Sequence, residues 1–124
     1  RYGRLSLMSY TTAQLSTAVM QHLALLDATE TIDATDQTFI TDTWAAKWEE
    51  LSAHGMEMTY FPYDDIPNPV FLAVRDLVAN EVRGAFGMPL SASDKEAEEV
   101  TIMRRLRRHL QTQGSKKAVA VSYF

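Results

Sequence analysis

Residues 68–86 read NPVFLAVRDLVANEVRGAF and carry the clearest structural pattern in the chain. Asn68 is a favoured N-cap, and Pro69 suits the first helical position because its missing N–H is not needed there. Gly87 and Pro89 then end the pattern. Apolar side chains recur at spacings of three and four, the period of one helical face; they are Val70, Val74, Leu77, Val78, Val82 and Phe86. We therefore predict an amphipathic helix over residues 69–86.

Two more helices are predicted before this stretch. In residues 12–27, leucine and valine recur on one face, and Thr11 and Gln14 have the spacing of a capping box, which satisfies free backbone groups at a helix start. In residues 35–54 the apolar line consists of Ile40, Trp44, Trp48 and Leu51. Gly55 follows this line and can adopt the left-handed conformation with which many helices end.

The connection between the second and third predicted helices has a different composition. Residues 56–61 alternate weakly between polar and apolar side chains, which indicates a short strand or an extended loop. Asp64-Asp65-Ile66-Pro67 is typical of a turn followed by extended backbone, because Asp accepts local backbone hydrogen bonds and Pro restricts the residue before it. Trp44 and Trp48, which precede this connection, are predicted to be core residues with part of their surface available for a subunit interface.

A fourth helix is predicted over residues 94–112. Ser93 and Glu96 form a second capping box, and the apolar line consists of Val100, Met103, Leu106 and Leu110. Acidic side chains crowd the first turns and arginines the last ones, so both ends complement the helix dipole, and Gly114 closes the helix. Because the connections are short, we expect the helices to pack as neighbours in an all-α, four-helix bundle-like domain that covers residues 1–113.

Residues 114–124 have no helical period and are expected to form an extended C-terminal arm. Their alternation of apolar side chains is typical of a strand. A lone strand leaves its backbone groups unpaired, so the arm is either disordered or added to the edge of a sheet. We favour the second alternative, with the sheet on another chain.

Length and composition indicate a single globular domain, since a chain of 124 residues can bury about two-thirds of its unfolded surface. No apolar run is long enough to span a bilayer, and the first residues lack the apolar stretch of a signal peptide. The absence of cysteine excludes disulfides, cysteine-based zinc sites and thiol nucleophiles, and favours a cytoplasmic product. Every acidic residue lies before Arg104, so the body of the domain is acidic. This charge argues against nucleic-acid binding by the domain surface as a whole.

Motifs for catalysis, metal binding and cofactors are missing from the sequence. His22, His54 and His109 lie on three different segments, and none has a His or carboxylate at ligand spacing. Asp64 and Asp65 are adjacent and supply too few ligands for a hard cation. There is no Gly-x-Ser-x-Gly elbow and no phosphate-binding glycine loop. We therefore expect a non-catalytic chain without metal or cofactor that works by binding other proteins.

Four arginines form the most prominent charged feature: Arg104, Arg105, Arg107 and Arg108. On a helix they form a band opposite the apolar line, and three interpretations stay open. The band can be a solvated face that complements the helix dipole, a contact surface for an acidic protein, or a surface that binds DNA phosphates without sequence specificity.

The order of several features has a known counterpart. A tryptophan-bearing helix ends in a glycine (Trp48 to Gly55), and an aromatic-rich connector leads to the turn at residues 64–67. An amphipathic helix then ends at Phe86-Gly87, and a last helix over residues 93–113 has acidic early turns and basic late ones. From Trp44 onward this order resembles the head-completion adaptors of tailed bacteriophages, including the tail accessory factors of short-tailed phages.

The resemblance implies a ring, usually of twelve copies, beneath the portal vertex of the virion. Such a ring extends the DNA channel, helps to retain the packaged genome and offers a platform to the next tail component. The implied partners are the portal protein, neighbouring copies, a tail or nozzle protein, and passing double-stranded DNA without sequence-specific contacts. The implied location is the head-to-tail interface of the virion, after synthesis in the host cytoplasm and without a membrane partner.

The resemblance and the charges together assign candidate sites. The C-terminal segment of family members typically reaches the portal, which implies portal binding by Lys116, Lys117, Val119, Val121, Tyr123 and Phe124. Rings need complementary flanks, and the candidates for contacts between subunits or with the DNA channel are Arg104, Arg105, Arg107, Arg108, Asp64 and Asp65. The main alternative is a small helical DNA-binding or regulatory module that uses the arginine helix. A toxin, an antitoxin or another enzyme-binding protein is a third alternative, and no feature of the sequence supports it.

Overall fold

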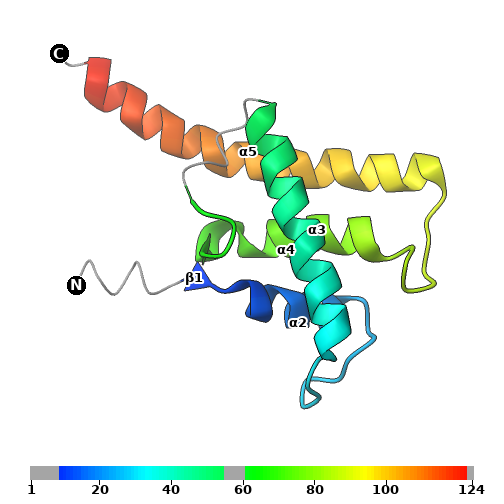
Figure 1. Cartoon of the computed structure of the whole chain (residues 1–124). Coiled ribbons are helices and arrows are strands. Elements are labelled where there is room, and N and C mark those ends of the chain that lie inside the picture. The colour runs from blue at the N-terminus through cyan, green and yellow to red at the C-terminus, as the bar shows by residue number, and fades with distance from the viewer. Residues whose placement is uncertain (1–8, 55–60, 123–124) are drawn as a thin grey trace.

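The computed structural model describes residues 9–54 and 61–122, and most of these residues are helical. This part of the chain contains four α-helices and one pair of two-residue strands (Figure 1). In chain order the elements are β1 (Ser9–Tyr10), α2 (Thr12–His22), α3 (Ala34–Ala53), β2 (Ile66–Pro67), α4 (Asn68–Val82) and α5 (Ala92–Ser122). The predicted all-α class is therefore confirmed. No described helix is both long and apolar enough to cross a membrane.

Helix α4 lies at the centre of the molecule, and α2, α3 and α5 all pack against it (Figure 1). Its buried side chains are distributed around most of the circumference of the helix; they are Val70, Phe71, Ala73, Val74, Leu77, Val78, Ala79, Asn80 and Val82. The other helices add Leu15, Val19, Ile40, Trp44, Ile102 and Leu106 to the same core. Because each fully buried valine or leucine stabilises the fold by about 1.5–3 kcal/mol, α4 supplies a large share of the driving force for folding.

The start of α4 differs from the prediction. Pro67, not Asn68, is the N-cap residue, and no side chain caps the helix. The Asn68 side chain instead accepts a hydrogen bond of 3.1 Å from the hydroxyl of Tyr10. Tyr10 also stacks on Phe71, with 3.9 Å between ring centroids, and β1 pairs antiparallel with β2 through Tyr10 and Ile66. The segment before α2 is thereby fastened to the start of α4.

The C-terminal end of α4 is earlier than predicted, at Val82 instead of residue 86. Residues 83–87 continue as turns, and Gly87 adopts a positive φ of 80°. The Met88 N–H then donates to the Arg83 carbonyl over 2.9 Å, and the Gly87 N–H donates to Gly84 over 3.2 Å. These two bonds form a Schellman closure, for which glycine in the left-handed conformation is the favoured residue.

For helix α2 the predicted start is confirmed and the predicted end is wrong. Thr11 and Gln14 form both hydrogen bonds of the capping box. The helix ends at His22 rather than at residue 27, because Ala24 takes a left-handed conformation with φ 61°. The Leu25 N–H donates to the Met20 carbonyl over 2.9 Å, which closes a Schellman motif without a glycine.

Both tryptophans of α3 hold the connector that follows this helix. Trp44 is fully buried and donates from Nε1 to the Tyr63 carbonyl over 2.6 Å. Trp48 is half-buried and donates from Nε1 to the Phe61 carbonyl over 3.2 Å. The predicted core position of Trp44 is confirmed, whereas the strand or loop predicted over residues 56–61 lies outside the described residues except for Phe61.

Helix α5 is much longer than predicted. It begins at Ala92, where the Ser91 hydroxyl rather than Ser93 accepts the Asp94 N–H over 3.2 Å. It continues through Gly114 to Ser122 and extends past the rest of the molecule (Figure 1). The prediction of an extended arm from residue 114 is therefore wrong for residues 114–122, and residues 123–124 lie outside the described part. One glycine costs a helix only about 1 kcal/mol, and propagating an existing helix is easier than nucleating a new element.

Candidate functional site

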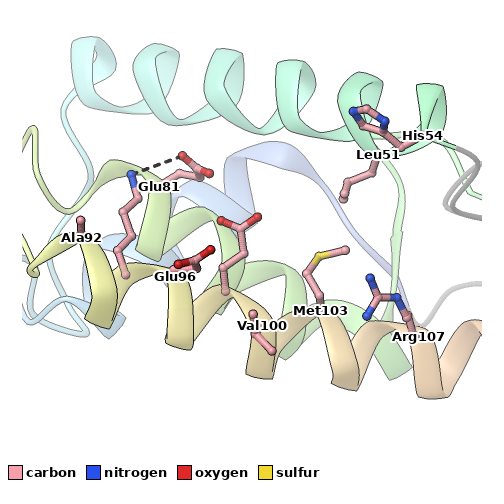
Figure 2. Close-up of a pocket in the computed structure, with 10 residues that line it drawn as sticks. Leu51, His54, Glu81, Ala92, Glu96, Val100, Met103 and Arg107 are labelled. Carbon is pink, nitrogen blue, oxygen red and sulfur yellow. Dashed lines mark ion pairs between the residues drawn. The ribbon is translucent and has the colours of Figure 1, made fainter.

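A groove of about 700 Å³ lies between the C-terminal end of α3, the helix α4 and the first half of α5 (Figure 2). We call it the α5 groove, and its lining residues are Leu51, His54, Glu81, Ala92, Lys95, Glu96, Glu99, Val100, Met103 and Arg107. In this lining Leu51 and Met103 are buried, Val100 is 49 % exposed, and most of the other side chains are charged. A surface of this kind suits a protein partner that supplies an apolar side chain and matching charges.

Beside the groove, Lys47 of α3 joins three helices by ion pairs. Its Nζ lies 3.2 Å from Glu81 Oε1 on α4 and 3.2 Å from Glu99 Oε2 on α5. A third carboxylate, of Glu50, lies 3.9 Å away. Burial alone would lower the pKa of Lys47, but the hydrogen bonds and charges of Glu81 and Glu99 outweigh it, and the pKa is raised. Lys47 is therefore a charged structural centre that holds α3, α4 and α5 together.

The ion pairs leave two charges of the groove without a partner. Lys95 lies 3.8 Å from Glu81, a pair marked by the dashed line in Figure 2. Glu99 is held by Lys47. Among the described residues, no ion pair includes Glu96 or Arg107, and both side chains are exposed. These two charges are available to a partner.

A second charged centre, Asp76 of α4, lies among α2, α4 and α5. Arg105 donates to Asp76 Oδ2 over 2.6 Å, and Arg75 donates from Nε to Oδ1 over 2.9 Å. His22 Nε2 lies 3.5 Å from the same Oδ1. Burial alone would raise the pKa of Asp76, but the hydrogen bonds from Arg105 and Arg75 and the charges of Arg75 and His22 lower it. This carboxylate stays ionised and fixes α5 to the central helix.

The four predicted arginines do not act as one group. Arg105 is half-buried and belongs to the Asp76 centre. Arg104, Arg107 and Arg108 are exposed. Three arginines thus remain on the surface of α5, and one has a structural role that the sequence did not reveal.

Asp64 and Asp65 lie at an exposed turn between the connector and β2. The Asp65 N–H donates to the Pro62 carbonyl over 3.2 Å, so the turn covers residues 62–65 rather than 64–67, and Ile66–Pro67 form β2 instead. No ion pair within residues 9–54 and 61–122 joins Asp64 or Asp65 to the arginines of α5. The two groups of candidates are not brought together within one copy.

The residues assigned to portal binding lie at the far end of α5 and beyond it. Lys116, Lys117, Val119 and Val121 are on the helical stretch that passes the body of the molecule. Tyr123 and Phe124 lie outside the described residues. The portal-binding role of these residues stays a prediction.

The three histidines have separate surroundings. His22 faces Asp76, His54 lines the α5 groove, and His109 is exposed. Within the described part of the chain, no group of three or more metal-binding side chains lies close enough to hold an ion.

Sequence reasoning missed the Lys47 centre, although one pattern indicates it. Lys47 continues the buried stripe of α3, which is Ile40, Trp44, Lys47 and Leu51. A lysine within an otherwise apolar stripe requires a buried partner, but the spacing of one helix cannot tell which carboxylates of other helices supply it.

No family model, no curated protein and no solved structure matches the chain. Function therefore has to follow from the geometry of the chain and from the order of its motifs.

Proposed function

We propose that the chain is a structural adaptor of a tailed bacteriophage, which forms a ring between portal and tail and extends the DNA channel. The observation that carries this proposal is the form of α5. Its first half packs on the body, and its second half extends past the body (Figure 1). At 1.5 Å per residue, its 31 residues span about 46 Å. Such a helix lets a small body reach a second protein.

The order of the motifs supports the phage assignment. The tryptophan helix α3 holds the aromatic connector through hydrogen bonds from Trp44 and Trp48. The turn at Asp64 and Asp65 leads into α4, and Gly87 closes the end of that segment. Of the motifs on which the resemblance to head-completion adaptors rests, the two tryptophans, the turn and Gly87 thus have a structural role in the described part of the fold.

The charge distribution supports an assembly of many copies. All 16 acidic residues precede Arg104, and the side chains that follow include six basic ones: Arg104, Arg105, Arg107, Arg108, Lys116 and Lys117. Rings are built from head-to-tail interfaces, in which one flank must complement another. Opposite charges on the two parts of the chain give such an interface its orientation.

Electron microscopy of the virus or prophage particles that encode the chain tests the proposal. Antibody label against the chain is expected at the vertex that joins head and tail, and particles without the chain should lose packaged DNA. A residue 118–124 deletion should leave a folded protein that no longer joins the portal. Absence of the chain from particles, or label elsewhere on them, would sink the proposal.

A DNA-binding module is the alternative, because Arg104, Arg107 and Arg108 are exposed. In that case, duplex DNA would be retarded in a gel at low salt, and replacing the three arginines by glutamine would abolish the shift. The adaptor is expected to leave the mobility of DNA unchanged under the same conditions. Lys95→Gln serves as a control for loss of a positive charge elsewhere on α5.

A further inference from the structure

Carboxylates without a cationic partner gather before α3 and in its first turns. Residues 23–46 contain five acidic side chains and no lysine, arginine or histidine. Among the described residues, none of the five takes part in an ion pair; they are Asp27, Glu30, Asp33, Asp36 and Asp42. Asp27, Glu30 and Asp33 are exposed and belong to the loop that leads into α3. We call these three residues the acidic end.

Two exposed arginines lie at the other end of α3. Arg107 of α5 lines the α5 groove together with Leu51 from the last turns of α3 and with His54, the C-cap of that helix (Figure 2). Arg104 lies about one turn earlier on α5 and is also exposed. No ion pair within residues 9–54 and 61–122 includes either arginine. We call Arg104 and Arg107 the arginine end.

The two ends are too far apart to neutralise each other within one copy. Helix α3 has 20 residues, so it is about 30 Å long at 1.5 Å per residue. The acidic end precedes the first residue of this helix, and the arginine end lies beside its last turns. Salt screens charges over about 8 Å at physiological ionic strength, so the ends hardly interact along the helix. Both ends are therefore free to bind another molecule.

The acidic end also lies next to apolar surface that suits an arginine. Leu25 precedes it and is 40 % exposed, and Phe39 follows it in α3 and is 41 % exposed. The Phe39 ring makes an edge contact with Phe86, with 5.9 Å between ring centroids. An arginine can pack its methylene stem on such side chains and its guanidinium on an aromatic ring while it pairs with a carboxylate. The surface around the acidic end thus matches the arginine end in more than charge.

We propose that the acidic end of one copy binds the arginine end of the next copy, with Asp27 and Glu30 facing Arg104 and Arg107. The two patches differ, so the contact is heterologous, and contacts of this kind close into a ring or continue as a filament. Pairing of like ends would bring like charges together, which fixes the head-to-tail direction. The contact deepens the proposed function and rests on it, because it names the two flanks by which copies of the adaptor join.

Sedimentation equilibrium of the full chain tests the contact. We expect concentration-dependent association at low salt that weakens as salt is added. Two reversals are compared with the original chain: Asp27→Arg/Glu30→Arg at the acidic end and Arg104→Glu/Arg107→Glu at the arginine end. Each reversal places like charges across the contact and should raise the dissociation constant about tenfold or more.

Asp64→Arg/Asp65→Arg is the matched control for the reversal of the acidic end. It makes the same change of charge on two exposed side chains of another turn. Its dissociation constant should stay within about threefold of the original value. A loss of association in this control as large as that in the acidic-end reversal contradicts the proposed contact.

An equimolar mixture of the two reversals distinguishes direct contact from a loss of folding. In the mixture, the intact arginine end of one variant can bind the intact acidic end of the other. The two reversed ends again carry opposite charges. Association should therefore return to within about threefold of the original dissociation constant.

Cross-linking measures the head-to-tail order, because the chain contains no cysteine. Glu30→Cys and Arg104→Cys are treated with a short bis-maleimide, each alone and both together. We expect a linked dimer in the mixture and little in either variant alone, since a heterologous contact brings two different positions together. Leu72→Cys places the thiol on α4, where the side chain is 53 % exposed, and should not link to Glu30→Cys.

The outcomes separate this contact from the adaptor function. A chain that stays monomeric at every concentration, a mixture as weak as either reversal, or equal linking of one cysteine variant with itself overturns the contact. If the acidic-end reversal leaves association unchanged while antibody label lies at the head-to-tail vertex, the contact is wrong and the adaptor function stands. If the contact is found but the chain is absent from particles, the adaptor function is wrong and the contact stands.

Discussion

Arg105 of α5 donates a hydrogen bond of 2.6 Å to Asp76 of α4, and this bond fixes the orientation of the long helix on the central one. Asp76 is only 16 % exposed, and its second oxygen is held by Arg75. His22 of α2 lies 3.5 Å from that oxygen. One carboxylate thus connects three helices, and one arginine of the sequence-predicted surface band is part of the internal structure.

Asp76→Asn is expected to lower the free energy of unfolding by about 1–2 kcal/mol at neutral pH, because two arginines lose their charged acceptor. The pKa of Asp76 is lowered from its ordinary value of 3.8, so its stabilising effect is present above pH 3.8 and is lost as the pH falls through the folded-state value. Urea unfolding of both proteins at several pH values should show a difference that shrinks in acid.

Asp64→Asn is the control for this measurement, since Asp64 is exposed on the turn before β2. Its effect should stay within about 0.5 kcal/mol at every pH. A difference between Asp76→Asn and the original chain that does not change with pH would contradict the role of the Asp76 charge.

Lys47→Met is expected to destabilise the fold by about 2 kcal/mol, because Glu81 and Glu99 would then face each other without their cation. The pKa of Lys47 is raised above 10.5, so its contribution is present below pH 10.5 and is lost as the pH rises through the folded-state value. Chemical denaturation at neutral pH measures the loss.

Two further variants separate the partly buried ion pairs of Lys47 from the exposed one. Glu50 lies 3.9 Å from Lys47 and is 57 % exposed, so Glu50→Gln should cost no more than about 0.5 kcal/mol. Adding Glu81→Gln to Lys47→Met should recover part of the lost stability, because it removes one uncompensated carboxylate. Additive effects of the two substitutions would show that the Lys47–Glu81 pair is not coupled.

The sequence predicts the helices well because their apolar period and caps are local properties. The helix of residues 69–86 and the capping box of Thr11 and Gln14 depend on neighbours within a few positions, and the structure contains both with shifted ends. The predicted helix ends are wrong where the chain departs from the rule that glycine ends a helix. Ala24 ends α2 without a glycine, and Gly114 does not end α5.

The candidate site was harder to predict, because it depends on contacts between helices. The sequence predicts the exposure of Arg104, Arg107 and Arg108, and all three side chains are exposed. The roles of Lys47 and Arg105 do not, because their partners lie on other helices, 52 and 29 positions away in the chain. A pattern along one helix shows that a charge will be buried, and only the packing of the helices shows what neutralises it.

Ala24→Gly is expected to stabilise the protein by about 0.5–1 kcal/mol. Ala24 has φ 61°, where its Cβ is strained and glycine is not. Thermal or urea unfolding should show the gain. Ala28→Gly, in the next turn, has no left-handed residue to relieve and should lower the stability slightly through the freer unfolded chain. Stabilisation by both substitutions would contradict the Schellman closure at Ala24.

Removing residues 114–124 is expected to leave the stability of the body unchanged, because this end of α5 extends past the rest of the molecule (Figure 1). Far-UV circular dichroism should lose helical signal, since residues 114–122 belong to α5 and not to an extended arm. The midpoint of thermal unfolding should stay the same, because helix propagation beyond the packed region adds little to the free energy of the body. A lower midpoint would instead mean that this segment packs against the core, and an unchanged helical signal would mean that it is not helical in solution.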